Sequence, residues 1–202
     1  MLIKAVILSL TSFILLINIG YSQTRQNEFS FSYGLYSSNG AWIETFGQSR
    51  VSAFTLGIFS LEPENIRETG PVLISYKHVL NSRFGLGIIA GITHVKYDLK
   101  ESSIFTKEYT TTNVNRSNLT LAPEFDFRYL FRGNFNLYSL IGLGFTFVDN
   151  NNTPALSVAN KPDHFGFHLS VIGIRFGKEL GGFIELGTGY KGLINFGINY
   201  QF

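Results

Sequence analysis

Six charged residues stand in stretches that are otherwise apolar or built from small residues, where they could act on one another. They are Lys77, Glu124, Asp126, Arg128, Arg175 and Glu185. Residues 124, 126 and 128 are charged at every second position, so an extended strand would place these side chains on one face. Three bases and three acids facing a common interior would form a neutral network. Such a network could be a proton or ion path or a structural plug, and we favour the plug because an unpaired buried charge is costly.

His164, His168 and Ser170 lie close together in sequence and suggest two kinds of chemistry. On a helix, histidines four residues apart would reach one metal ion, but on a strand they lie about 13 Å apart at ~3.3 Å per residue. We therefore expect no metal and no cofactor. With Asp163, these residues supply the side-chain types of a serine hydrolase, but a triad is defined by its geometry and not by proximity in sequence. No catalytic activity is expected.

The composition differs from that of an ordinary soluble domain. The 202 residues are 45% apolar and 15% aromatic, and only 15% are charged, whereas a soluble domain carries about 25% charged residues. The 21 glycines disfavour long helices. The net charge of +2 is too small to suggest nucleic acid as a partner. The absence of cysteine excludes disulfides and thiolate chemistry.

The first 22 residues have the layout of a secretory signal peptide. Lys4 precedes an apolar run over residues 5–19, and small residues follow at Gly20 and Ser22. We expect cleavage between Ser22 and Gln23, which leaves residues 23–202 as one domain. An uncleaved membrane anchor is the alternative, although the apolar run is shorter than the ~20 residues that a spanning helix needs.

After the signal peptide, apolar residues alternate with polar or small ones in runs of about ten, as in membrane-spanning β-strands. In the last run, Phe196, Ile198 and Tyr200 share one face, with Asn195 and Asn199 on the other. We expect strands over residues 28–36, 71–80, 84–99, 118–130, 136–147, 164–176, 183–190 and 193–202. The alternation of the sixth run is ambiguous in phase. Aromatic residues near strand ends are expected to form interfacial girdles: Tyr76, Tyr129, Phe147, Tyr190, Tyr200 and Phe202.

These strands predict an all-β fold, a closed antiparallel transmembrane β-barrel. In hydrocarbon every backbone N–H and C=O needs an internal partner, which closure provides. Eight strands leave an interior that side chains fill. Short connections near 81–83, 132–134 and 177–182 alternate with long ones over 37–70, 100–117 and 149–163. Outer-membrane barrels have short periplasmic turns and longer outside loops, so both chain ends would face the periplasm.

The first long connection leaves the strand number open. Residues 41–60 could form a short amphipathic helix within an extracellular loop. They could instead add two strands, because Asn39-Gly40 is a strong hairpin signal and residues 51–60 are strand-like. We expect eight strands, with ten as the alternative.

Three segments carry a family resemblance. The C-terminal GIRFGKELGGFIELGTGYKGLINFGINYQF, with GPVLISYKHVLNSRFGLG and LYSLIGLGF upstream, resembles small OmpA/OmpX-like outer-membrane β-barrel proteins of Bacteroidetes-type bacteria. The resemblance covers most of the mature chain and implies a place in a Gram-negative outer membrane. It also implies that Phe202 is the terminal aromatic residue recognised by the barrel-assembly machinery. It implies no activity, because this family is largely uncharacterised.

The leading functional hypothesis is a structural or interaction barrel whose loops serve adhesion, surface recognition or envelope integrity. Its partners would be outer-membrane lipids, the barrel-assembly machinery during insertion, and an extracellular ligand of unknown chemistry. The first alternative is a lipid-modifying hydrolase that uses His168 and Ser170, by analogy with outer-membrane deacylases and phospholipases. The second is a narrow channel or secretion accessory. Conductance and analysis of lipid products would separate the three.

Overall fold

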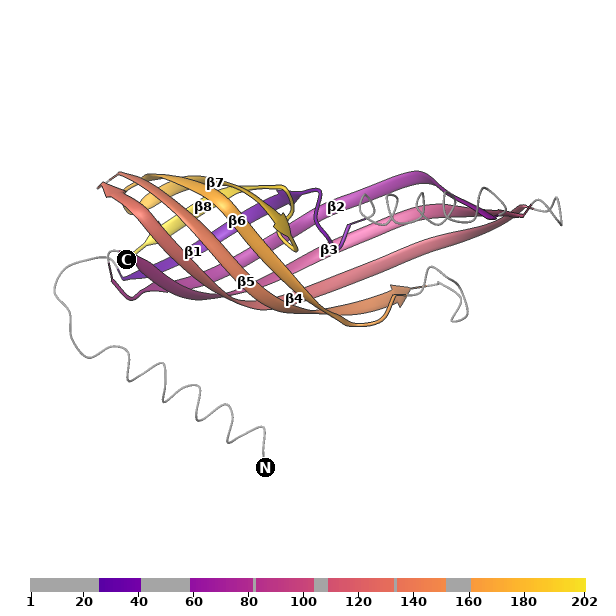
Figure 1. Ribbon diagram of the computed structural model, residues 1–202, viewed down its shortest axis with the longest axis horizontal. Coiled ribbons are helices and arrows are strands. Elements are labelled where there is room, and N and C mark those ends of the chain that lie inside the picture. Colours follow the sequence, from indigo (N-terminus) through magenta and orange to yellow (C-terminus); the bar gives the residue numbers. More distant parts are fainter. Residues whose placement is uncertain (1–25, 41–58, 82, 104–108, 133, 152–160) are drawn as a thin grey trace, which may run out of the picture.

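The computed structural model describes residues 26–40, 59–81, 83–103, 109–132, 134–151 and 161–202. Its strands are β1 (Asn27–Leu35), β2 (Phe59–Val79), β3 (Phe84–Ser103), β4 (Tyr109–Arg132), β5 (Phe135–Asn151), β6 (His164–Gly177), β7 (Leu180–Gly189) and β8 (Ile194–Gln201). Each strand pairs antiparallel with the next, and β1 pairs with β8, so the sheet closes (Figure 1). The prediction of a closed eight-stranded antiparallel barrel is confirmed.

Two sequence-based predictions fall largely on other parts of the chain. The signal peptide expected over residues 1–22 lies outside the described residues. So does most of the segment considered for a helix or an extra hairpin, of which only Phe59 and Ser60 are described, as the first residues of β2. In the described part of the chain, no helix is long and apolar enough to cross a membrane.

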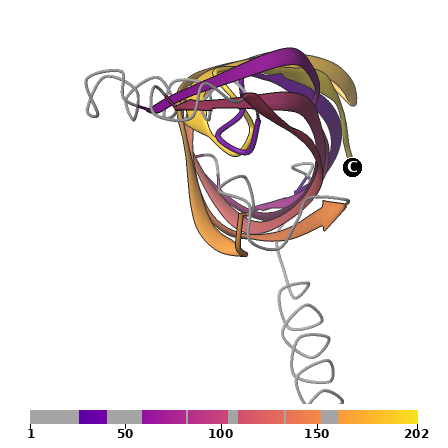
Figure 2. The same cartoon turned by 90° about the vertical axis from the view of Figure 1, so that its right-hand side faces the viewer.

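Alternation along the strands gives the barrel two chemically different surfaces. On β1, Phe29 and Phe31 are 46% and 48% exposed, whereas Ser30 and Ser32 are buried. Register continues the pattern across strands, since Phe31 is paired with Ile74 of β2. Seen from the end, the strands form a ring around an interior (Figure 2). Apolar side chains therefore cover the outer wall. The inside is filled mainly by polar side chains, together with a small apolar cluster of Leu73, Ile89, Ala122 and Tyr190.

The wall is much taller on one side than on the other. β2, β3 and β4 have 21, 20 and 24 residues, whereas β1, β7 and β8 have 9, 10 and 8. Figure 1 shows the long strands continuing past the ends of the short ones. The barrel thus has a low rim over β7, β8 and β1 and a tall sheet over β2, β3 and β4.

The long connections are shorter than predicted, because the strands of the tall sheet extend into them. Strands extend into the ranges 37–70, 100–117 and 149–163 as far as Phe59, Ser103, Tyr109 and Asn151. In this upper part the outward side chains are polar, as at Thr69, His94 and Ser117. The inward side chains are apolar there, with Val95, Tyr97 and Val114 buried, so the apolar face changes from outside to inside while the backbone pairing continues. Strand bounds drawn from outward apolar residues alone are therefore too short.

A β-bulge in β6 explains the ambiguous alternation of residues 164–176. The register against β7 shifts between Ser170 and Ile172. Ser170 is buried in the interior, Val171 and Ile172 are both exposed, and Arg175 is buried again. One extra residue in the bulge changes the phase of all that follows, so a strict period of two cannot describe the whole strand.

The β7–β8 turn sends two side chains into the barrel. Gly189 and Gly192 have φ of 126° and 100°, a conformation that glycine adopts without a steric penalty. Between them, Tyr190 is 1% exposed and Lys191 is 3% exposed. The prediction that Tyr190 belongs to an outer aromatic girdle is therefore wrong, because the turn ends the alternation of β7 before this residue.

Candidate functional site

The barrel interior is the candidate functional site, because buried polar side chains from all eight strands line it. The six charges singled out from the sequence are each at most 7% exposed there: Lys77, Glu124, Asp126, Arg128, Arg175 and Glu185. Glu28 and Lys191 join them. In the described part of the lumen these eight make four acids and four bases, and Arg116 is buried farther along β4 toward the tall end.

The lower cluster consists of Glu28, Lys77, Asp126, Arg128 and Arg175, near the end of the barrel with the short turns. Asp126 lies between two bases, with Oδ1 3.3 Å from Lys77 Nζ and Oδ2 2.8 Å from Arg128 Nε. Glu28 Oε2 lies 3.8 Å from Arg128 Nη2 and 3.9 Å from Arg175 Nε. Five charges from four strands thus form one network.

Backbone and amide groups complete the lower cluster. Arg175 donates from Nη1 to the carbonyl of Gly177 at 3.0 Å and from Nη2 to that of Lys178 at 2.9 Å. Gln201 of β8 donates from Nε2 to Glu28 Oε2 at 2.6 Å. These bonds tie the network to the β6–β7 turn and to the last strand.

The middle cluster consists of Glu124, Glu185, Lys191, Tyr138 and Tyr190. Lys191 Nζ lies 3.2 Å from Glu124 Oε1 and 2.9 Å from Glu185 Oε2. Tyr190 donates to Glu124 at 2.9 Å, and Tyr138 donates to Glu185 at 2.9 Å. Lys191 belongs to the turn and not to a spanning strand. Burial favours a lower pKa, but Glu124 and Glu185 raise the pKa of Lys191 above its ordinary value.

Glycines on β5 and β6 leave room for the two tyrosine rings. A methyl group on Gly142 would overlap the Tyr190 hydroxyl, and one on Gly173 would overlap the Tyr138 ring. The Tyr138 ring also joins the two clusters, because Lys77 Nζ lies 5.4 Å from its centroid in cation–π geometry. The lumen charges therefore form one connected system.

His168 and Ser170 are close together, but not in the arrangement of a catalytic triad. His168 Nε2 and Ser170 Oγ share a hydrogen bond of 2.9 Å, and Ser170 donates to Glu185 Oε2 at 3.3 Å. A triad needs the acid on the far nitrogen of the histidine, whereas here the acid lies on the serine. Both residues are at most 1% exposed.

The other hydrolase and metal candidates lie elsewhere. Asp163 is exposed and accepts from the backbone N–H of Val148 at 2.7 Å. His164 Nε2 lies 3.2 Å from Asn39 Oδ1. In the described residues no three His, Asp or Glu side chains are grouped to hold a metal ion. The structure therefore does not bring Asp163 and His164 together with His168 and Ser170.

An upper polar layer closes over the two clusters. Residues 37–40 turn into the barrel mouth, where Gly40 N–H donates to the Ser37 carbonyl at 3.0 Å. Asn39 Nδ2 donates to Thr120 Oγ1 at 2.9 Å and to Thr146 Oγ1 at 3.2 Å. The Asn-Gly pair therefore lies in a turn inside the lumen, whereas the ten-strand alternative took it for the turn of an extra hairpin.

Little free space remains inside the lower cluster. The cavity bordered by Glu28, Lys77, Asp126, Arg128, Asn136, Tyr138 and Arg175 has a volume of about 10 Å³. That is room for about one water molecule. Packing at this level matches the filled interior expected for eight strands.

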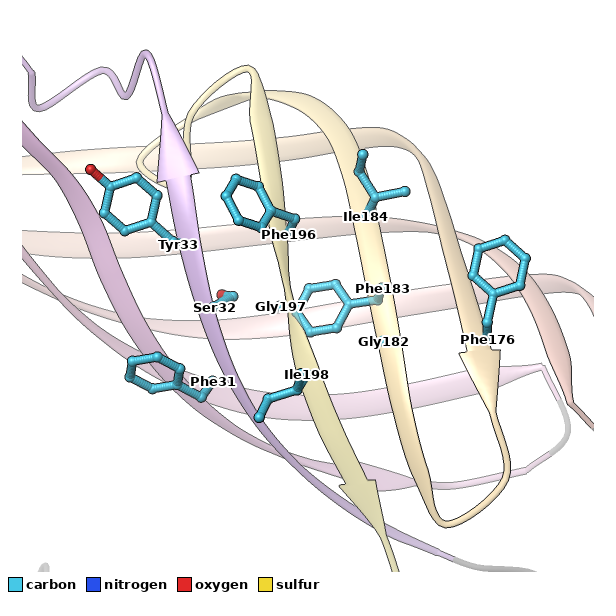
Figure 3. A pocket seen from close by; sticks show the side chains of 10 residues that line it. All are labelled: Phe31, Ser32, Tyr33, Phe176, Gly182, Phe183, Ile184, Phe196, Gly197 and Ile198. Atoms are coloured by element: carbon cyan, nitrogen blue, oxygen red, sulfur yellow. The ribbon is translucent and has the colours of Figure 1, made fainter.

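The outer wall has a shallow apolar groove over β1, β8, β7 and the end of β6. Figure 3 shows the aromatic and aliphatic side chains around it, among them Phe31, Phe176, Phe196 and Ile198. The groove has a volume of about 510 Å³. Gly182 contributes no side chain there, and a methyl group on it would contact the Gly197 carbonyl oxygen at 3.7 Å without overlap. The groove is lined by aromatic and aliphatic side chains, as is the rest of the outer wall.

Two charged residues of the lower and middle clusters were missed from the sequence, for different reasons. Glu28 stands at the start of the alternation of residues 28–36, on the face shared with Ser30 and Ser32. Alternation could therefore have placed Glu28 in the lumen. Lys191 follows the end of β7, where alternation gives no direction, and only the turn geometry places it.

Fold and lumen together define a small closed β-barrel with an apolar outer wall and a charged, packed interior. No family model matches the chain, and no curated protein matches it. One solved structure that it resembles is the outer membrane protein OprG from Pseudomonas aeruginosa. The match covers 88% of this chain and 96% of OprG, with a TM-score of 0.48 and 8% identity.

Proposed function

We propose that the protein spans a bacterial outer membrane as a structural or interaction barrel. The outer wall carries this proposal. Ile88, Leu143, Phe165 and Ile198 are 65%, 67%, 84% and 59% exposed, and similar side chains surround the barrel. A soluble monomer rarely exposes more than a few hundred Å² of continuous apolar surface. Lipid is the solvent in which such a wall is stable.

The two ends of the barrel indicate how it is oriented in the proposed membrane. The connections from β2 to β3, from β4 to β5 and from β6 to β7 are short, and the strand ends that they join lie at the same end as Asn27 and Phe202, whose backbones are hydrogen-bonded. Short turns are the periplasmic ends of outer-membrane barrels. The tall sheet of β2, β3 and β4 then projects outward, where it and the long connections can serve recognition or adhesion.

The packed lumen supports a role without conduction or catalysis. Paired charges and a space of about 10 Å³ in the lower cluster leave little room for ions or water. The arrangement of His168, Ser170 and Glu185 also differs from a triad. We therefore rank the channel and the lipid hydrolase below the structural barrel.

The experiment is fractionation of expressing cells followed by electrophoresis with and without boiling. We expect the protein in the outer-membrane fraction, with an unboiled band that migrates differently from the boiled one because the closed barrel resists the detergent. The purified protein should give no steady conductance in planar bilayers and no change in membrane lipids. A protein that stays monomeric and dispersed without detergent would overturn the proposal.

A further inference from the structure

The outer face of the tall sheet changes from apolar to polar and then to basic over two steps of its pairing register. Val72, Ile92, Leu119 and Phe147 are partners in one row across β2 to β5, and all are at least 36% exposed. The next outward row joins Thr69, His94 and Ser117, and the row after it joins Arg67, Lys96 and Asn115. Two residues of strand rise about 7 Å, so these rows lie at the height of lipid headgroups.

These polar rows border a hollow with a volume of about 630 Å³. Its lining residues are Arg67, Glu68, Thr69, His94, Lys96, Asn115 and Ser117. Glu68 is the single acid among them, and its carboxyl group lies against Gly40 on the inner side of the sheet. The outward surface of the hollow is therefore made by two permanent cations, a histidine and neutral hydrogen-bonding groups.

Arg67 and Lys96 are directly paired across β2 and β3. Like charges in directly opposite positions repel and destabilise a sheet. No ion pair with another described residue offsets this repulsion. Asp98, two residues farther out, accepts instead from Asn65 and Asn113 at 2.9 and 2.8 Å. An anion between Arg67 and Lys96 would turn the repulsion into attraction.

The neighbouring groups suit a phosphate. Arginine binds phosphate through parallel N–H donors, and lysine contributes a point charge. A hydrogen bond of 2.9 Å joins His94 Nδ1 and Ser117 Oγ. This bond holds the imidazole ring beside the two cations. Thr69 and Asn115 add neutral polar groups. Asp149 of β5 is paired with Ser117 but does not line the hollow.

We propose that Arg67, His94 and Lys96 bind a phosphate group on the headgroup of an outer-leaflet lipid. The inference rests on the proposed membrane orientation, because only that orientation places the hollow at the leaflet surface with the lipid's chains against Val72, Ile92 and Leu119. The low rim has no equivalent, since β7, β8 and β1 end near the top of the apolar wall. The bound lipid would therefore mark one side of the barrel.

The test measures binding of lipid A to the full mature chain refolded in a neutral detergent, by native mass spectrometry. Bisphosphorylated lipid A, enzymatically dephosphorylated lipid A and inorganic phosphate are the probes. Wild type should retain the bisphosphorylated form at least about tenfold better than an Arg67→Gln/Lys96→Gln variant, because two charge-assisted contacts are lost. An Arg83→Gln/Lys178→Gln variant, with two exposed cations removed at the opposite rim, should bind like wild type.

The outcomes separate this proposal from the membrane assignment. Equal retention by wild type and the Arg67→Gln/Lys96→Gln variant overturns the phosphate site, as does equal retention of dephosphorylated lipid A. Inhibition by inorganic phosphate at concentrations similar to those of lipid A would assign the site to free phosphate instead. Heat-modifiability reports folding of each variant. A wild-type protein that needs no detergent would remove the membrane orientation itself.

Discussion

Lys191 Nζ lies 3.2 Å from Glu124 Oε1, although 67 positions separate the two residues in the chain. Lys191 comes from the β7–β8 turn and Glu124 from the middle of β4. The ion pair therefore connects the β7–β8 turn, at the low rim, to β4 on the opposite side of the barrel. Because Lys191 also contacts Glu185 at 2.9 Å, a single ammonium group serves both acids of the middle cluster.

Lys191→Met should destabilise the barrel strongly. The substitution leaves Glu124 and Glu185 buried without their common base, and breaking a buried pair in this way costs about 3–5 kcal/mol. Urea unfolding in lipid vesicles, followed by the heat-modifiable band, measures the loss. Lys178→Met is the matched control, since this lysine is exposed in the β6–β7 turn and its loss should leave the midpoint unchanged. Equal midpoints for the two variants would contradict the role of Lys191.

Single substitutions elsewhere in the network should also lower stability. Glu124→Gln, Arg128→Met and Glu185→Gln each remove one charge and leave its partners buried, so each should lower the unfolding midpoint in vesicles. Arg83→Met, at an exposed position, controls for loss of an arginine. If all three lumen variants melted like wild type, the charges would not form a paired network.

Gly142 and Tyr190 should be coupled. A methyl group on Gly142 would overlap the Tyr190 hydroxyl, so Gly142→Ala should cost about 1–3 kcal/mol by overpacking. Tyr190→Phe alone should cost roughly 1 kcal/mol for the lost hydrogen bond to Glu124. The double variant should be more stable than the sum of the two losses, as a double-mutant cycle detects. Strict additivity would show that the two groups do not meet.

Phe202 should matter more for assembly in cells than for stability in the test tube. Its side chain is 53% exposed and stacks on Tyr200 with centroids 5.7 Å apart, which leaves the ring accessible. We expect Phe202→Ala to slow insertion in cells while spontaneous folding into detergent changes little. Ile198→Ala, exposed on the same strand, is the control. Equal insertion of both variants in cells would count against a recognition role for the terminal ring.

Most of the fold could be predicted from the alternation of apolar and polar residues. Strands such as β4 and β8 could be phased residue by residue, because apolar outward residues and polar inward residues alternate along one backbone. Alternation alone therefore predicted that Glu124, Asp126 and Arg128 face the interior. In the upper halves of β2, β3 and β4 the apolar side chains lie inward instead, as Ile66, Val95 and Val114 do, so a pattern of outward apolar residues does not extend to them.

The rest of the site depends on features that alternation cannot express. The bulge at Val171 shifts the phase of β6 and so decides where Arg175 points. The positive φ at Gly189 and Gly192 directs Tyr190 and Lys191 inward. The turn at Asn39 enters the lumen because three polar side chains across the barrel bind it. Each is a tertiary contact or a local backbone geometry.

Spin-label accessibility along β8 tests the membrane barrel most directly, because the chain has no cysteine and single labels can be placed cleanly. Labels at 195–200 would be scanned in vesicles against oxygen, which concentrates in lipid. The account predicts high accessibility at Phe196, Ile198 and Tyr200 and low accessibility at Asn195, Gly197 and Asn199. A uniform profile, or one that is the same in plain buffer without lipid, would contradict it.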